Sequence, residues 1–346
     1  MAHRRLLAME ARSEPELPRG SGWQYEPKWD GFRCLARRTA GKVELIGRSG
    51  KNLSRYFPDV VANLARLKTR SFLLDGELVI PAGGVLSFEA LQMRLHPAAT
   101  RVSKLPAEHP GQLIAFDALQ IDSRKLEHET LSVRRQALEH LFSGVPQNAG
   151  LLLSPKTTRR ATASAWLERA ASGGLDGVVA KRLDAPYLPG ERAMIKVKCL
   201  RTADCVVGGF RYAGSSRQIG SLLLGLYNDA HKLDHVGFIA GFGGSERAQL
   251  TRLVLVLRGG SGFTGDAPGG PSRWSTERSA LWKPVKPKLV VEVQYDQVSG
   301  RRFRHGTRFV RWRPDKKPTD CTFYQLRQEA RPSRLLPALK HAERRK

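Results

Sequence analysis

The chain has 346 residues, which is enough for two domains of ordinary size, and its 41% hydrophobic content allows each domain to bury a core. Lysine and arginine number 58 against 32 aspartate and glutamate residues, a formal net charge of +26, so we expect a polyanionic partner, for which nucleic acid fits best. No apolar run approaches about 20 residues, no secretory signal begins the chain and no Cys-x-x-Cys spacing occurs, which argues against a membrane span, secretion and a structural zinc site and favours a cytoplasmic protein.

The first predicted elements are strands that follow an irregular segment. Residues 1–22 show no strong periodicity and are expected to form a loose entry segment. Two strands are predicted next, Tyr25–Arg37 and Lys42–Ile46, with Gly41 in the turn between them. This arrangement places Lys28 at the exposed edge of a sheet.

Lys28, Asp30, Gly31 and Arg33 form the pattern Lys-x-Asp-Gly-x-Arg, which nucleotidyltransferases use to hold a covalent nucleotide. A lysine nucleophile must lower its pKa from about 10.4 by roughly 3.4 units, or about 4.6 kcal/mol, before its amine is mostly neutral at pH 7. Cations and a divalent metal ion gathered around a triphosphate could supply that shift. Taken alone, the pattern also fits a surface lysine beside a turn.

The next segments add polar residues to predicted loops and strands. The loop Gly47–Asn52 carries Arg48, which could contact a nucleotide, although a plain hairpin connection fits equally well. The apolar spacing of Asp59–Leu67 predicts a helix with one buried face. In the apolar strand Ser71–Ile80, Asp75 and Glu77 would be costly to bury unless they hold a partner.

Four more elements complete the first half of the chain. The strand Leu113–Leu119 presents Phe116, whose flat face could stack on a purine, although most strand phenylalanines belong to a core. Helices are predicted over Ser132–Phe142, with Ser132 as N-cap, and over Ala163–Ala171. Asp176 begins the strand Leu175–Arg182 as a hard oxygen ligand suited to Mg²⁺.

The strand Met194–Lys198 places Lys196 and Lys198 on one face by alternation. Two ammonium groups on one face of a central strand would repel each other unless an anion lies between them, and a nucleotide α-phosphate would serve. The alternative is a half-exposed strand with solvated lysines.

A second β-rich region begins near Asp204. Strands are predicted over Cys205–Phe210, Ser221–Tyr227, Val236–Gly241 and Leu289–Tyr295, with one helix over Glu246–Leu257. Several short strands with a single helix indicate a small barrel. The arginine-rich stretch that follows ends in Arg313, Asp315 and Lys316, and residues 329–346 form a charged tail.

With these segments in order, the chain resembles the ATP-dependent DNA ligases, most closely the short bacterial type and the ligase module of bacterial end-joining enzymes. The resemblance extends from Trp23 to Leu326. The residues that match the ordered motifs of the family are Lys28, Asp30, Arg33, Arg48, Asp75, Glu77, Phe116, Asp176, Lys181, Lys196, Lys198, Arg313, Asp315 and Lys316. One departure is Asp176, where the family most often carries glutamate.

The resemblance implies an α+β fold with two domains. An adenylation (nucleotidyltransferase) domain with antiparallel sheets and flanking helices would span 23–200, after an entry segment at 1–22. An oligonucleotide-binding β-barrel would span 201–328, joined by a hinge near residues 200–204, and a basic tail would occupy 329–346.

The resemblance also implies the chemistry. Lys28 would attack the α-phosphorus of ATP, the lysyl adenylate would pass AMP to a DNA 5′-phosphate, and a 3′-hydroxyl would displace AMP. Arg313, Asp315 and Lys316 would orient the pyrophosphate. The residues implied to bind ATP are Glu26, Asp30, Arg33, Arg48, Glu77, Phe116, Lys196 and Lys198. Asp176 and Asp75 would bind Mg²⁺, or Mn²⁺ in its place.

The implied partner is nicked double-stranded DNA, in repair and recombination. We expect a monomer in the bacterial cytoplasm, associated with the nucleoid and not with a membrane. A repair polymerase or end-bridging proteins would act in trans.

Three other assignments remain open from sequence. An mRNA capping guanylyltransferase shares the lysine motif but transfers GMP, an RNA ligase shares the chemistry, and a basic DNA-binding protein could keep the fold without activity. The intact Lys28, Glu77 and Lys196 argue against the last of these.

Overall fold

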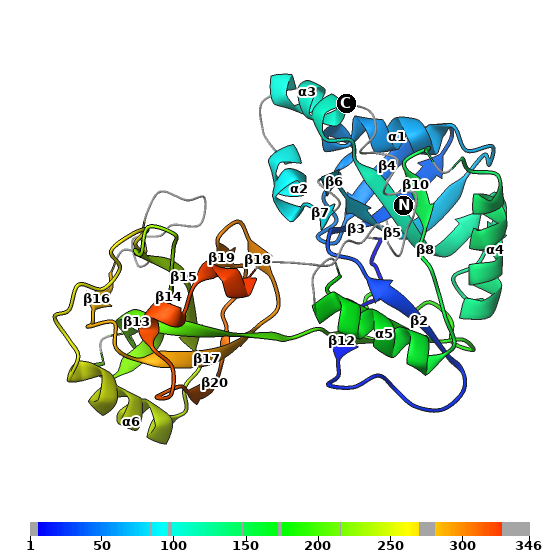
Figure 1. Cartoon of the computed structure of the whole chain (residues 1–346). Coiled ribbons are helices and arrows are strands. Elements are labelled where there is room, and N and C mark those ends of the chain that lie inside the picture. The colour runs from blue at the N-terminus through cyan, green and yellow to red at the C-terminus, as the bar shows by residue number, and fades with distance from the viewer. Residues whose placement is uncertain are drawn as a thin grey trace. The chain divides into compact units, whose positions relative to one another are not determined.

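A computed structural model describes residues 6–82, 85–95, 99–146, 148–171, 175–214, 216–269 and 281–326 (Figure 1). The predicted basic tail, residues 329–346, lies outside this range. The described residues divide into two compact units, and the division falls between Cys199 and Leu200. Each unit is described separately below.

The first unit contains two main sheets. The smaller sheet has the strand order β1-β12-β11-β2, in which β1 is parallel to β12 and the other pairs are antiparallel. These strands are β1 Ala11–Ser13, β2 Trp23–Lys28, β11 Gly177–Arg182 and β12 Met194–Lys198. The larger sheet has the order β10-β8-β5-β3-β4, with β9 paired to β8. These strands are β3 Phe32–Thr39, β4 Lys42–Gly47, β5 Phe72–Val79, β8 Gln112–Ile121, β9 Arg124–Lys125 and β10 Leu151–Leu153.

Helices flank these sheets. They are α1 Pro58–Ala65, α2 Phe88–Arg94, α3 Ala99–Glu108, α4 Leu131–Ser143 and α5 Arg160–Ala171. A short hairpin, β6 Pro81–Ala82 with β7 Val85–Leu86, follows β5. The N-cap of α4 is Thr130, whose side chain accepts a hydrogen bond from the Val133 backbone N–H, so the prediction of Ser132 as the cap is wrong by two residues.

The single strand predicted over Tyr25–Arg37 is also wrong, because the chain leaves one sheet after Lys28 and enters the other at Phe32. Gly31 lies at the crossing, where an added Cβ would approach the Leu78 carbonyl oxygen to 2.2 Å, so only glycine fits without a shift of the backbone. The nucleophile motif therefore connects the two sheets.

The segment before β2 is more ordered than the predicted loose entry segment. Met9 and Leu17 are buried, and β1 extends the smaller sheet beside β12. The physical reason is tertiary: a three-residue strand has no periodicity to detect, and it forms because the edge of β12 offers hydrogen bonds.

The faces of the smaller sheet have different roles. One face packs on α5 through a hydrophobic cluster that includes Tyr25, Val178, Ile195 and Trp166 (Figure 1). Because side chains alternate along a strand, the opposite face carries the charged residues of the same strands. Those residues are Glu26, Lys28, Lys181, Lys196 and Lys198.

The larger sheet alternates in the same way. Its covered face forms a core with α1, α2 and α4, which includes Cys34, Leu74, Leu113, Leu64 and Leu138. The other face of β3 and β5 carries Arg33, Asp75 and Glu77 by alternation.

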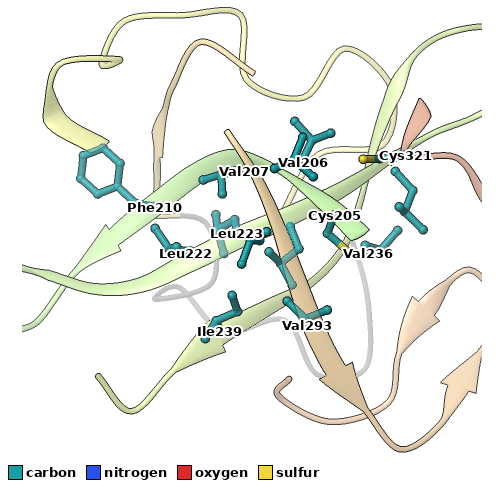
Figure 2. Close-up of a cluster of buried hydrophobic side chains, with 14 of the residues drawn as sticks. Cys205, Val206, Val207, Phe210, Leu222, Leu223, Val236, Ile239, Val293 and Cys321 are labelled. Atoms are coloured by element: carbon teal, nitrogen blue, oxygen red, sulfur yellow. The ribbon is translucent and has the colours of Figure 1, made fainter. Parts of the chain in front are cut away.

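The second unit is built on an antiparallel sheet of order β15-β14-β13-β17-β20, with β16 paired to β13. Its elements are β13 Arg201–Tyr212, β14 Ile219–Tyr227, β15 Leu233–Ala240, α6 Gly244–Leu255, β16 Lys283–Pro284, β17 Val290–Tyr295, β18 Val298–Ser299, β19 Arg302–Phe303 and β20 Arg308–Trp312. Figure 2 shows the core between these strands, where Cys205, Val206, Leu223 and Val293 are fully buried.

The fold class predicted from sequence is confirmed, as an α+β unit with antiparallel sheets and flanking helices followed by a β-rich unit with one longer helix. Within the described residues, the sheet path of the second unit stays open, and a single bridge between Ile239 and Thr307 links β15 to the segment before β20. No helix in the described part of the chain is long and apolar enough to cross a membrane.

Candidate functional site

Lys28 ends β2, the edge strand of the smaller sheet, and its Nζ lies 2.5 Å from Oδ2 of Asp176. The Asp176 backbone N–H donates to the Lys28 carbonyl oxygen at 3.0 Å, which fixes the two residues relative to each other. Burial lowers the pKa of Lys28, but the Asp176 carboxylate, with Glu77 and Asp30, raises it by more, so the net pKa is above its usual value. The free protein therefore holds Lys28 as an ammonium ion, opposite to the shift that a nucleophile needs.

Asp176 lies at the centre of a cationic group. Its carboxylate is 6% exposed, Lys198 Nζ lies 3.9 Å from Oδ2, and Oδ1 is buried without a hydrogen-bond partner among the described residues. The next residue, Gly177, has φ +143°, and an added Cβ would lie 2.1 Å from the Val197 carbonyl oxygen, so glycine is required there. A buried carboxylate oxygen that has no hydrogen-bond partner among the described residues fits a ligand for a hard cation.

Lys196 and Lys198 project from the same face of β12, as their spacing predicts. Burial lowers the pKa of Lys196, and the positive charges of Lys28 and Lys198 lower it further. The three ammonium groups thus repel one another, although Asp176 pairs with Lys28 and Lys198, and Glu10 offsets part of the repulsion at Lys196. An additional anion bound here would relieve that repulsion.

Asp75, predicted to bind a metal ion, has a carboxylate that is held by two side chains in this structure. Arg33 donates a hydrogen bond to each of its oxygens, from Nε to Oδ1 at 2.6 Å and from Nη2 to Oδ2 at 2.5 Å. Tyr187 also donates its hydroxyl to Oδ2 at 2.5 Å. These contacts make Asp75 an anchor for the Arg33 guanidinium in this structure, and its predicted role as a metal ligand stays a prediction.

Glu26, predicted to bind ATP, is buried beside Lys181 in this structure, and its ATP-binding role stays a prediction. It accepts from Lys181 Nζ at 2.9 Å and from Gln24 Nε2 at 2.8 Å, and both partners in the ion pair are buried. Breaking this buried pair would leave an uncompensated charge, so Glu26 is chiefly a structural partner of Lys181.

Phe116 lies beneath two cations. The guanidinium carbon of Arg33 lies 4.6 Å and the Nζ of Lys181 lies 4.7 Å from the ring centroid. The side chain is 8% exposed and belongs to a cluster with Trp29 and Leu175. The ring lies in the hydrophobic core and also borders the charged face. Its position is therefore compatible with both predictions for Phe116, a core residue and a residue that stacks on the purine.

Glu77 has an unusual acidity. Burial raises its pKa to about 7, against the lowering influence of Lys28 and Arg33, and Asp30 and Asp75 raise it further. It lies opposite Arg33 in the pairing of β5 with β3. A carboxyl group that titrates near pH 7 between two cations is typical of a functional site.

The sequence analysis did not identify the residues of the N-terminal segment that contact Arg33, Arg48 and Tyr187. The Met9 backbone N–H donates to the Tyr187 hydroxyl at 2.8 Å, and its carbonyl accepts from Arg33 at 3.2 Å. Glu10 pairs with the exposed Arg48 at 2.9 Å. No motif marks these residues, although a tyrosine in a proline-flanked loop signals a hydroxyl that needs a partner when it is buried.

The last predicted group lies in the second unit. Arg313 Nη1 lies 2.9 and 3.1 Å from the two carboxylate oxygens of Asp204, and Lys316 Nζ lies 2.7 Å from Oδ2 of the same residue. Arg313 also pairs with Asp315 at 2.9 Å. The structure thus brings Arg313, Asp315 and Lys316 together, around an acid that the sequence analysis passed over.

Two family models match the chain. The model described as ATP dependent DNA ligase domain matches residues 7–198, and the model described as ATP dependent DNA ligase C terminal region matches residues 215–316. The first range contains Lys28, Asp176 and the other charged residues of the first unit, and the second contains Arg313 and Lys316.

Full-length relatives agree with these models. The chain is 44% identical over 328 residues to DNA ligase C1 of Mycolicibacterium smegmatis, covering 92% of each chain. It is 40% identical over 333 residues to DNA ligase C of Mycobacterium tuberculosis, again covering 92% of each. A solved structure from a structure-function analysis of Lig E DNA ligases has a TM-score of 0.56 at 20% identity, covering 88% of this chain and 98% of that one, which is a likeness of fold.

Proposed function

The chain belongs to the ATP-dependent DNA ligase family, and we propose that it seals nicks in duplex DNA through a lysyl adenylate formed on Lys28. In the first step, Lys28 Nζ bonds to the α-phosphorus of ATP as the bond to the pyrophosphate oxygen breaks. AMP then passes to the 5′-phosphate at the nick, and the 3′-hydroxyl attacks that phosphate and releases AMP. The observation that supports this most directly is the Lys28–Asp176 pair, which lies on the same sheet face as Lys196 and Lys198.

The first requirement of this chemistry is a neutral Lys28. Asp176 keeps the amine protonated in the free protein, so the pKa of Lys28 falls only when the charge of Asp176 is engaged elsewhere. The orphaned Oδ1 of Asp176 fits a divalent metal ion such as Mg²⁺ or Mn²⁺, which would supply positive charge that lowers the pKa of Lys28 and neutralises phosphate oxygens.

The described residues contain no cluster of three or more His, Cys, Asp and Glu side chains that could hold a metal ion. A metal ion held by Asp176 would therefore need further ligands from the triphosphate. This is the usual arrangement for Mg²⁺ at phosphate-transfer sites. It also makes metal and ATP binding mutually dependent.

The second requirement is positive charge at the phosphates. Lys196 and Lys198 repel each other in the free protein, and the α-phosphate between them would turn that repulsion into attraction. The Arg33 guanidinium is held rigidly by Asp75, so it can be offered to the nucleotide without a further loss of side-chain entropy. Glu77 would accept from the ribose hydroxyls, and Phe116 would border the purine.

The decisive experiment is incubation of the protein with α-labelled ATP and a nicked DNA duplex. We expect label first on the protein, then on the DNA 5′ end, and finally in free AMP as the nick is sealed. Parallel reactions with α-labelled GTP and with nicked RNA test the capping and RNA-ligase alternatives. A protein that charges only with GTP, or that seals only RNA, would contradict the proposal.

We also propose that the enzyme works as a monomer, because a single chain carries every residue to which a role in the three steps is assigned. Light scattering of the free protein and of its complex with a nicked duplex measures this. A stable dimer in both states would contradict it.

A further inference from the structure

The second unit contains a small charged cluster centred on Asp204. This residue lies in β13 and is 8% exposed, so it is largely shielded from solvent. Its two oxygens face Arg313, and one of them also faces Lys316. One carboxylate therefore holds two cations that come from a separate segment of the chain.

The backbone of Asp204 is itself fixed. On one side it pairs with Glu292 of β17, and on the other side the strand pairing with β14 begins only at Val206. The side chain of Gln325 fills that gap, because its Oε1 accepts from the Asp204 N–H at 2.9 Å and its Nε2 donates to the Asp204 carbonyl at 3.1 Å. Both backbone polar groups are thus satisfied, and the carboxylate is presented from a rigid position.

The two cations are less constrained than Asp204. Arg313 follows the last residue of β20 and keeps one strand-like hydrogen bond, from its N–H to the Val290 carbonyl at 2.9 Å. Lys316 lies in the turn after it, held by a hydrogen bond from its N–H to the Arg313 carbonyl at 3.2 Å. Without a common counter-ion, two long cationic side chains would separate and sample many rotamers.

We infer that Asp204 is a positioning residue for the first step of ligation, which holds Arg313 and Lys316 together as one preassembled cationic pair. This inference rests on the proposed function, and on the role that the resemblance to DNA ligases implies for Arg313 and Lys316, which is to orient the pyrophosphate leaving group. Asp204 reaches the phosphates only through Arg313 and Lys316. It keeps the two charges at a fixed separation, so that the leaving group meets an organised pair.

The inference predicts a step-specific defect. Asp204→Asn keeps the side-chain volume but removes the charge that holds the cations. We expect self-adenylation to slow by about 10-fold to 100-fold, the range for misplacing groups that must be aligned. Sealing of a nick supplied already adenylated should stay at the wild-type rate, because no pyrophosphate leaves in that reaction.

Glu292→Gln is the matched control. Glu292 is the direct cross-strand neighbour of Asp204, but its carboxylate pairs with Arg311 at 2.7 Å and lies 3.8 Å from Arg313. We expect it to leave both reactions within about twofold of wild type, because its main partner Arg311 is an exposed cation to which the proposal gives no role in either reaction. A general electrostatic effect of removing an acid from this sheet would instead appear in both variants.

A double-mutant cycle separates positioning from folding. If Asp204 acts through the cation pair, then Asp204→Asn should slow the residual self-adenylation less when either Arg313 or Lys316 alone is already alanine than it does in the wild type. Equal losses in self-adenylation and in sealing of adenylated nicks, together with a lower unfolding temperature, would show that Asp204 is only structural and would overturn the inference. Unchanged or faster self-adenylation would overturn it as well.

The wild-type arm tests the proposed function separately. If the wild-type protein forms no lysyl adenylate, the proposed function fails whatever the variant does. If the wild-type protein forms the adenylate and Asp204→Asn forms it at the same rate, the proposed function stands and the inference about Asp204 fails.

Discussion

The two charged clusters of this protein differ in how completely their charges are satisfied. In the first unit, Lys28 and Lys198 share the carboxylate of Asp176, Lys196 is repelled by both of these lysines, and one Asp176 oxygen is buried without a partner among the described residues. In the second unit, Arg313 and Lys316 are matched by Asp204 and Asp315. The first cluster has positive charge that a bound anion would offset, whereas the positive charge of the second is offset by its own acids.

This difference has a physical consequence for catalysis. Binding of an anion and a metal ion lowers the free energy of an unsatisfied site. Its residues therefore move little on binding, while their pKa values shift. A satisfied site is stable without a ligand, so its residues can contribute to one step and withdraw from the next. We therefore expect the first cluster to act throughout the reaction and the second to act in a single step.

The largest expected effect is from Lys28→Ala. We predict complete loss of the covalent enzyme-nucleotide species, because Lys28 is the lysine of the Lys-x-Asp-Gly-x-Arg pattern and the Lys198 amine, at 3.9 Å from Asp176 Oδ2 against 2.5 Å for Lys28, does not occupy its position. The fold should persist, since Lys28 ends an edge strand and is not part of the described hydrophobic clusters. Gel detection of label from α-labelled ATP and circular dichroism measure the two properties. Label that survives on the variant would mean that another residue is the nucleophile.

The next largest effect contrasts the two clusters directly. Replacing Arg313 and Lys316 with alanine should block self-adenylation but spare sealing of nicks that are already adenylated. Replacing Lys196 and Lys198 should impair both reactions, because these residues would hold the α-phosphate and the AMP that derives from it. Rates of the two reactions, measured side by side for both double variants, give the comparison.

DNA affinity across salt concentrations is the control for this contrast. Each lost phosphate contact lowers the salt slope by about 0.9. A pair that acts only on ATP should leave the slope unchanged. If the Arg313 and Lys316 variant seals adenylated nicks as poorly as it charges itself, and its slope is reduced, then the second cluster is a DNA-binding surface and the contrast between the units is wrong.

The sequence located the charged face of the first unit because its residues follow short-range rules. Alternation along β12 places Lys196 and Lys198 together, and a carboxylate at the start of β11 stands out before an apolar run. The family, the fold class and the use of ATP were all predictable from such motifs and are confirmed.

What the sequence did not reveal depends on tertiary contacts. The break between β2 and β3 was missed because residues on both sides have strand-like composition, and only the packing of Gly31 on Leu78 forces the crossing. The anchoring role of Asp75 was missed because its partner Tyr187 is remote in sequence. Asp204 was overlooked for the same reason, since its cations come from beyond β20.

A more moderate effect tests how Asp176 controls Lys28. Because Asp176 raises the pKa of Lys28, Asp176→Asn should lower it in the free protein. Lys28 should then react faster with an amine-directed reagent at pH 8, while self-adenylation with ATP and Mg²⁺ falls at least tenfold, or about 1.4 kcal/mol. Mass spectrometry of the modified lysine across pH measures the reactivity of Lys28. Lys156→Gln, a substitution far from the motif residues in sequence, is the control for a general change in lysine reactivity. Unchanged reactivity of Lys28 would refute the pairing.

The smallest expected effect is on folding stability, because burial makes the charged form of Glu77 unfavourable. Its pKa of about 7 in the folded protein exceeds the ordinary value near 4.5, so the folded state binds the proton more tightly than the unfolded state does. The stability that this proton contributes is fully present below pH 4.5 and is lost as the pH rises through 7. Glu77→Gln mimics the protonated form and should therefore stabilise the first unit at pH 8 but not at pH 4.5.

The full shift corresponds to about 3 kcal/mol, and the partial exposure of Glu77 reduces the expected gain to about 1 to 2 kcal/mol. Hydrogen exchange of the β5 amides at both pH values, without metal or nucleotide, measures the stability of this unit alone. Asp315→Asn is the matched control from the second cluster, because Arg313 lowers the pKa of Asp315 to about 2 and its removal should give no gain at pH 8 in its own unit. A gain at Asp315, or a gain at Glu77 that is equal at both pH values, would show that the two clusters do not differ in the way their charges are satisfied.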